Sequence, residues 1–136
     1  MSTAAINVSS SSTFLRRVLA LDAAVTAGNG LIYVVAAGPV GRLLDVSPDL
    51  LTGLGIFLLA YGAAVGYLAS RPVPPNGWVR VVVGANVAWV VASLGALLFG
   101  WLDPSTAGTV WIPLQAAVVA GFAALQAVGL NRRERG

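Results

Sequence analysis

The sequence predicts an all-α fold, a four-helix transmembrane bundle, and two observations predict it. Of the 136 residues, 57% are hydrophobic and only 10% are charged, more apolar surface than one small soluble core could hide. The apolar residues also fall into four segments of about 20 residues or more, each long enough for a helix to cross a ~30 Å hydrocarbon layer. In that layer a single segment satisfies its own backbone groups only as a helix.

The chain divides into one membrane domain and two short tails. Residues 1–14 are polar and serine-rich, which is typical of a disordered cytoplasmic tail. A single four-helix domain is expected over 15–131, followed by a basic cytoplasmic tail at 132–136. The predicted helices cover 15–37, 49–70, 78–101 and 109–130.

Turn and capping residues separate these helices. Gly38-Pro39 ends the first helix. Ser47-Pro48-Asp49 begins the second with an N-cap, a first-turn proline and an acid that suits the helix dipole. A proline-rich turn at 71–77 precedes the third helix, and the run 103–106 caps the fourth.

The arginines predict the orientation. With a cytoplasmic N-terminus, seven of the eight basic residues lie on the inner side: Arg16, Arg17, Arg71, Arg80, Arg132, Arg133 and Arg135. Only Arg42 lies on the outer side. This bias predicts a multi-pass protein of the cell inner (plasma) membrane with both termini cytoplasmic. The absence of lysine, with abundant alanine, valine and glycine, indicates a GC-rich bacterial genome.

A faint internal repeat relates the two halves of the chain. Asn29 precedes the run 33–36 (YVVA), and Asn86 precedes 89–92 (WVVA). A duplicated helical hairpin explains this match, but so does coincidence in a composition rich in alanine and glycine.

Asp22 is the most informative residue, because an acid near the centre of a membrane helix costs about 2.5–3.5 kcal/mol on the insertion scale. Residues at i, i+4, i+7 and i+11 from Asp22 share its helix face, and three residues of the other helices lie at a similar depth. The candidate intramembrane polar site therefore consists of Asp22, Thr26, Asn29, Tyr33, Tyr61, Asn86 and Gln126.

Two interpretations of Asp22 stay open. In the functional one, Asp22 binds a proton or cation and is gated by Asn86 and Tyr61. In the structural one, Asp22 pairs with an arginine, and the amides bond between helices to fix their packing. The arginines considered are Arg16, Arg17 and Arg80.

Several chemistries are excluded by composition. The chain has no cysteine and no histidine, which excludes thiol redox pairs, cysteine or histidine nucleophiles, ordinary zinc sites and histidine-ligated haem. We therefore expect no enzyme activity, no catalytic residue, no cofactor and no metal. The arginines lie at the ends of apolar runs, so despite a pI of about 10.2 they are suited to lipid headgroups and not to nucleic acid.

The expected partners are the lipid bilayer and another membrane protein or a second copy of this chain. Small residues at four-residue spacing, such as Gly62 and Gly66, allow helices to approach closely. Such spacing serves packing within one chain or a dimer interface.

Three stretches resemble a group of bacterial proteins. Residues 53–72 (GLGIFLLAYGAAVGYLASRP), 84–108 (GANVAWVVASLGALLFGWLDPSTAG) and 114–133 (LQAAVVAGFAALQAVGLNRR) resemble an uncharacterised family of small four-helix integral membrane proteins. The resemblance covers about residues 15–133 and implies the architecture, without an established activity.

The chain is also loosely similar to the small multidrug resistance exporters. They are four-helix proteins of about this length with one acid in the first helix, and Asp22 echoes that position. This chain departs from the family in having aspartate in place of glutamate, in lacking the surrounding motif, and in its proline-rich middle loop.

Two function classes follow from the sequence. The first is a non-enzymatic membrane accessory or interaction protein whose polar residues are structural. The second is a small transporter or hydrophobic-ligand-binding bundle that uses Asp22 as a proton- or cation-linked site.

Overall fold

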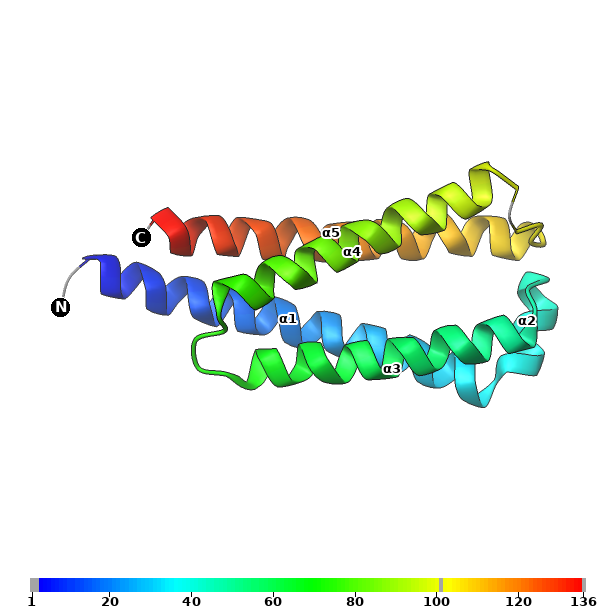
Figure 1. Ribbon diagram of the computed structural model, residues 1–136, viewed down its shortest axis with the longest axis horizontal. Helices are drawn as coiled ribbons and strands as arrows, with labels where there is room; N and C mark the ends of the chain where they lie inside the picture. The colour runs from blue at the N-terminus through cyan, green and yellow to red at the C-terminus, as the bar shows by residue number, and fades with distance from the viewer. Residues whose placement is uncertain (1–2, 101, 136) are drawn as a thin grey trace.

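The computed structural model describes residues 3–100 and 102–135, and the side chains of 12–100 and 102–132. Its helices are α1 (Thr3–Val35), α2 (Ala37–Leu44), α3 (Pro48–Ser70), α4 (Asn76–Leu98) and α5 (Thr106–Arg135). All regular secondary structure in these ranges is helical, which confirms the predicted fold class. Figure 1 shows two helical pairs, α1 with α3 and α4 with α5, and α1 also packs on α5.

Four of the helices are long and apolar enough to cross a membrane. The candidate spans are Ser12–Val35 of α1, Pro48–Ser70, Asn76–Leu98 and Thr106–Arg132 of α5. Their mean hydropathies lie between 1.6 and 2.1. This is the architecture of a multi-pass membrane protein built as a helical bundle.

The prediction of a disordered tail over 1–14 is wrong for the described part of that segment, because α1 is helical from Thr3. No glycine or proline occurs before Gly28, so nothing interrupts the helix once the apolar segment has nucleated it. At the other end of the chain, α5 continues past the predicted residue 130 to Arg135. Residues 1, 2 and 136 lie outside the described residues.

The short helix α2 was not expected, because Gly38-Pro39 was interpreted as the end of the first segment. The helix is interrupted at Ala36 instead, where φ is −117° and ψ is 32°. Pro39 then lies in the first turn of α2, where a missing backbone N–H costs no helical hydrogen bond. The first segment therefore ends at Val35, and the following residues form a helix that packs on α3 and α5.

Other helix boundaries follow the local caps. The Leu50 N–H lies 3.5 Å from the Ser47 hydroxyl oxygen at the start of α3, a long contact in the expected N-cap position. The Ser105 hydroxyl accepts from the Gly108 N–H at 3.2 Å in the first turn of α5. The α4 helix ends at Leu98, not at 101, and Gly100 follows with a φ of 72°, a conformation that favours glycine and ends helices.

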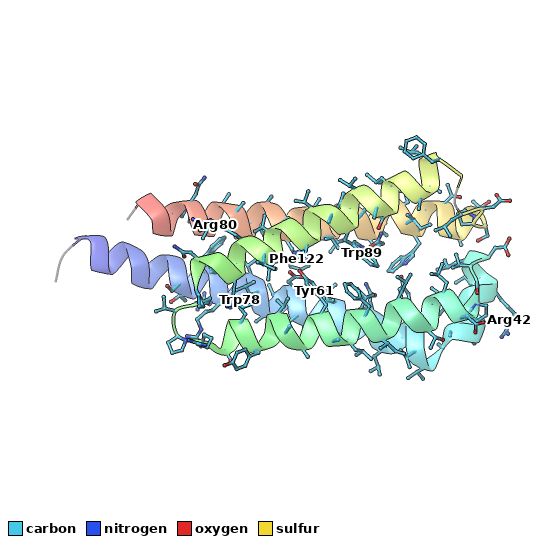
Figure 2. The ribbon with its side chains drawn as sticks, viewed as in Figure 1. Arg42, Tyr61, Trp78, Arg80, Trp89 and Phe122 are labelled. Carbon is cyan, nitrogen blue, oxygen red and sulfur yellow. The ribbon has the colours of Figure 1, made fainter. Side chains whose placement is uncertain are left out.

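The two ends of the bundle differ in charge. Both termini and the α3–α4 connection lie at one end, and α2 and the α4–α5 connection lie at the other (Figure 1). Arg80 lies toward the first end and Arg42 at the second (Figure 2). We call the first the arginine-rich end, because helix order also places Arg16, Arg17, Arg71 and Arg132 there. The side chains of Arg133 and Arg135 lie outside the described residues.

Helices α1 and α3 approach each other through glycines. A Cβ atom on Gly55 would lie 2.7 Å from the Gly30 carbonyl oxygen, and one on Gly30 would lie 2.8 Å from the Gly55 carbonyl oxygen. A Cβ on Gly62 would lie 3.0 Å from the Ala27 nitrogen. Only glycine fits at the first two positions, because the obstructing atoms belong to the opposite backbone.

We expect Gly55→Ala to destabilise the bundle by about 1–3 kcal/mol, because the added methyl group forces the α1 and α3 backbones apart. Gly53→Ala on the same helix is the control, since no atom lies within 4 Å of the Cβ it would add. Thermal unfolding of both variants in mild detergent checks the difference. Equal midpoints for the two variants would contradict the close approach.

Candidate functional site

The site is centred on Asp22, which is only 1% exposed. Asp22 lies ten residues along α1 from Ser12, where the candidate span begins, which is about 15 Å at 1.5 Å per residue. This distance is half of a ~30 Å hydrocarbon layer. Asp22 therefore lies near the middle of the candidate span.

Three side chains donate hydrogen bonds to the Asp22 carboxylate. The Gln126 amide donates to Oδ2 at 2.7 Å, and the Asn86 amide donates to the same oxygen at 3.0 Å. The Thr26 hydroxyl donates to Oδ1 at 3.1 Å from one turn along α1. Asp22 thus draws α4 and α5 onto α1 through polar groups that the bundle buries almost completely.

The network continues beyond the carboxylate to α3. The second hydrogen of the Asn86 amide is directed at the Gln126 Oε1 atom, at 3.1 Å. The Asn86 Oδ1 atom accepts from the Tyr61 hydroxyl at 3.0 Å, and the Val82 carbonyl oxygen lies 3.3 Å from the same hydroxyl. Because amide nitrogens only donate, the Asp22 carboxyl oxygen accepts from both Asn86 and Gln126, and these bonds orient the two amides.

Among the residues whose side chains the structure describes, the donors recorded for Asp22 are uncharged. Of the arginines considered as partners, Arg16 directs its Nε to the Ala69 carbonyl oxygen at 3.1 Å, where it caps the end of α3. Amide and hydroxyl dipoles therefore solvate the carboxylate through these three hydrogen bonds. Such dipoles lower the cost of burying a charge without neutralising it.

A cavity of about 250 Å³ borders the carboxylate between α1 and α5. Asp22, Thr26, Asn29 and Tyr33 all line it, so the helix face predicted from their spacing is present. Tyr33 takes no direct part in the Asp22 network. Its hydroxyl accepts from the Trp111 indole at 2.7 Å. The structure thus joins five of the seven predicted residues by hydrogen bonds and places Asn29 and Tyr33 beside them.

Two further cavities adjoin the first. One, of about 330 Å³, lies between α3 and α4 and includes Tyr61 and Asn86 in its wall. The other, of about 270 Å³, extends toward the α2 end of the bundle. Trp89 lines all three cavities. The α3 and α4 backbones are not closely packed in the described part of the chain, which leaves this space between the two helical pairs.

Aromatic side chains form one wall of that space. The Phe57 ring stacks with the Tyr61 ring at 6.0 Å and with the Trp89 ring at 6.3 Å, each pair within 10° of parallel. Figure 2 shows Tyr61 and Trp89 in the region between the two helical pairs. The Trp89 indole also donates to the Gln115 Oε1 atom at 2.7 Å. The space between the two helical pairs is therefore largely apolar and aromatic, with a few fixed polar groups.

Phe57 and Trp89 are site residues that were not predicted, although the sequence carries a signal for both. Trp89 follows Asn86 by three residues, and Phe57 precedes Tyr61 by four. Residues at these spacings share a helix face. The helical periodicity that groups Thr26 with Asp22 on α1 therefore also groups Trp89 with Asn86 on α4 and Phe57 with Tyr61 on α3.

Comparison with protein-family models, curated proteins and solved structures finds no match to this chain. The interpretation of the site consequently rests on its geometry.

We expect the Asp22–Gln126 hydrogen bond to appear as a coupling energy in a double-mutant cycle. Asp22→Ala, Gln126→Ala and the double variant should show about 0.6–1.7 kcal/mol of coupling, the range for interhelical polar bonds in membranes. Unfolding by denaturing detergent measures it. The matched cycle uses Gln115→Ala, because Gln115 bonds to Trp89 instead, and it should be additive. Additivity in the Gln126 cycle would contradict the network.

Proposed function

We propose that this protein is a hydrophobic-ligand-binding or transporting bundle in which Asp22 is a proton- or cation-linked site. The observation that carries the proposal is a carboxylate, 1% exposed, that receives its hydrogen bonds from neutral donors and borders a cavity. Protonation removes the charge of a buried carboxylate, and a bound cation pairs with it, so either lowers the cost of burial. Ionisable groups inside membrane spans commonly mark such sites.

The surroundings support a ligand that is mostly apolar. Apolar and aromatic side chains dominate the cavity walls, and a few polar groups converge at one place. This combination is typical of small-molecule sites. A proton or cation bound at Asp22 weakens the hydrogen bonds that Asn86 and Gln126 donate to the carboxylate. The change passes to Tyr61 through the Asn86 Oδ1 atom and so reaches the wall of the second cavity.

The second candidate is a non-enzymatic accessory or interaction protein. It is supported by the complete pairing of the Asn86 amide, which donates to Asp22 and Gln126 and accepts from Tyr61. A network satisfied in this way fixes the packing of four helices without any ligand. In that case the partner is another membrane protein or a second copy of the chain.

The protein's location and its lack of enzymatic chemistry are parts of the same proposal. The excess of arginine at one end supports a plasma-membrane protein with both termini in the cytoplasm. The absence of lysine, with abundant alanine, valine and glycine, supports a bacterial origin. The absence of cysteine and histidine from the sequence supports a non-enzymatic role without a cofactor or metal.

We expect the wild type to retain a hydrophobic small molecule when it is extracted from its host membrane, and Asp22→Asn to lose it. The reason is that a side-chain amide binds neither the proton nor the cation that the carboxylate binds. Native mass spectrometry after extraction in mild detergent measures the retained mass. Asp49→Asn is the control, because Asp49 is exposed in the first turn of α3, and it should keep the ligand.

A wild type without any added mass, together with equal stability of the wild type and Asp22→Asn, would contradict the ligand site. If Asp22→Asn lowers the unfolding midpoint and the wild type carries nothing, the accessory function is favoured.

A further inference from the structure

A separate cleft lies between α3 and α4 at the arginine-rich end. Its volume is about 410 Å³. Ala64, Val65 and Leu68 of α3 line one side, and Val81 and Val82 of α4 line the other. None of these five residues carries a polar side chain, so this part of the cleft suits a hydrocarbon group.

The cleft runs along the helices, and its length is less than the thickness of the hydrocarbon core of one membrane leaflet. It extends from Tyr61 to Leu68 on α3, a rise of about 10 Å at 1.5 Å per residue. The hydrocarbon core of one leaflet is about 15 Å thick, half of the ~30 Å layer. A chain lying in the cleft would therefore run parallel to neighbouring acyl chains.

The mouth of the cleft carries a cation and two amphipathic aromatic residues. Arg71 lines it where α3 ends, and Tyr67 and Trp78 flank it with 67% and 64% of their surfaces exposed. Trp78 lies toward the arginine-rich end (Figure 2). Tyrosine and tryptophan favour the headgroup level of a membrane, and arginine pairs with phosphate through a planar fork of donors. The groups thus follow the order of a phospholipid, with the charge at the mouth and the apolar walls below it.

We propose that this cleft binds one anionic phospholipid, with its phosphate at Arg71 and an acyl chain between α3 and α4. Charge complementarity selects an anionic headgroup, because Arg16, Arg17, Arg80 and Arg132 belong to the same end of the bundle as Arg71. Basic pockets between membrane helices on the cytoplasmic side bind such headgroups. The cleft shares Tyr61 with the second cavity, but Asp22 does not line it, and the inference does not rest on the proposed ligand site.

Native mass spectrometry of the full chain in mixed micelles tests the site. Phosphatidylglycerol and phosphatidylcholine are supplied in equal amounts. The wild type should retain one phosphatidylglycerol in preference to phosphatidylcholine. Arg71→Gln should lower that retention about fivefold, as expected for one basic residue at a membrane surface, whereas Arg42→Gln at the opposite end should leave it unchanged.

A second pair of variants tests the acyl-chain position. Ala64→Phe fills the cleft and should reduce retention of both lipids. Ala60→Phe, one turn away on the same helix and also exposed, should not. Asp22→Asn should retain the lipid, which separates this site from the proposed ligand site. Equal retention of the two lipids, a wild-type result for Arg71→Gln, or equal effects of the two phenylalanine variants would overturn the inference.

Discussion

The bundle depends on the solvation of one carboxylate near the middle of a hydrocarbon layer. The hydrocarbon of a membrane supplies no hydrogen-bond donors at this depth, so protein groups supply them. Three helices do so: Thr26 from α1, Asn86 from α4 and Gln126 from α5. Removing one donor leaves a buried carboxyl oxygen with fewer hydrogen bonds, which costs more than the net contribution of an ordinary hydrogen bond. The position of Asp22 thus constrains the rotation of each surrounding helix.

The contacts between the two helical pairs differ from the contacts within the first pair. Within the first pair, Gly30 and Gly55 let the α1 and α3 backbones touch. Between the pairs, α1 packs on α5, whereas α3 and α4 are bridged mainly by side chains, including the Tyr61–Asn86 hydrogen bond and the Phe57–Trp89 stack. Long side chains hold helices apart as well as together. The space they leave forms the cavities beside Asp22.

The spans and most of the polar site were predictable from sequence, because they depend on local patterns. Hydropathy and caps such as Ser47 fix where helices lie, and helical periodicity places Thr26 on the face of Asp22. The start of α1 at Thr3 and the helix α2 were not predictable in this way. The serine-rich segment has low apolar content but no helix breaker, and Pro39 fits a first turn as well as a termination. Which donors reach Asp22 depends on the rotation of α4 and α5, which one sequence does not specify. The sidedness of the arginines stays a prediction.

Infrared difference spectroscopy tests most directly whether Asp22 is a buried, proton-linked carboxyl group. The spectra are recorded across a pH titration of the protein in lipid bilayers. If Asp22 is a proton-linked carboxylate buried among amide donors, acidification produces the carbonyl stretch of a protonated carboxyl group shielded from water. That band should be present in the wild type and in Asp49→Asn and absent in Asp22→Asn, with changes in the amide side-chain bands of Asn86 and Gln126 accompanying it. Identical difference spectra for the wild type and Asp22→Asn would contradict this assignment.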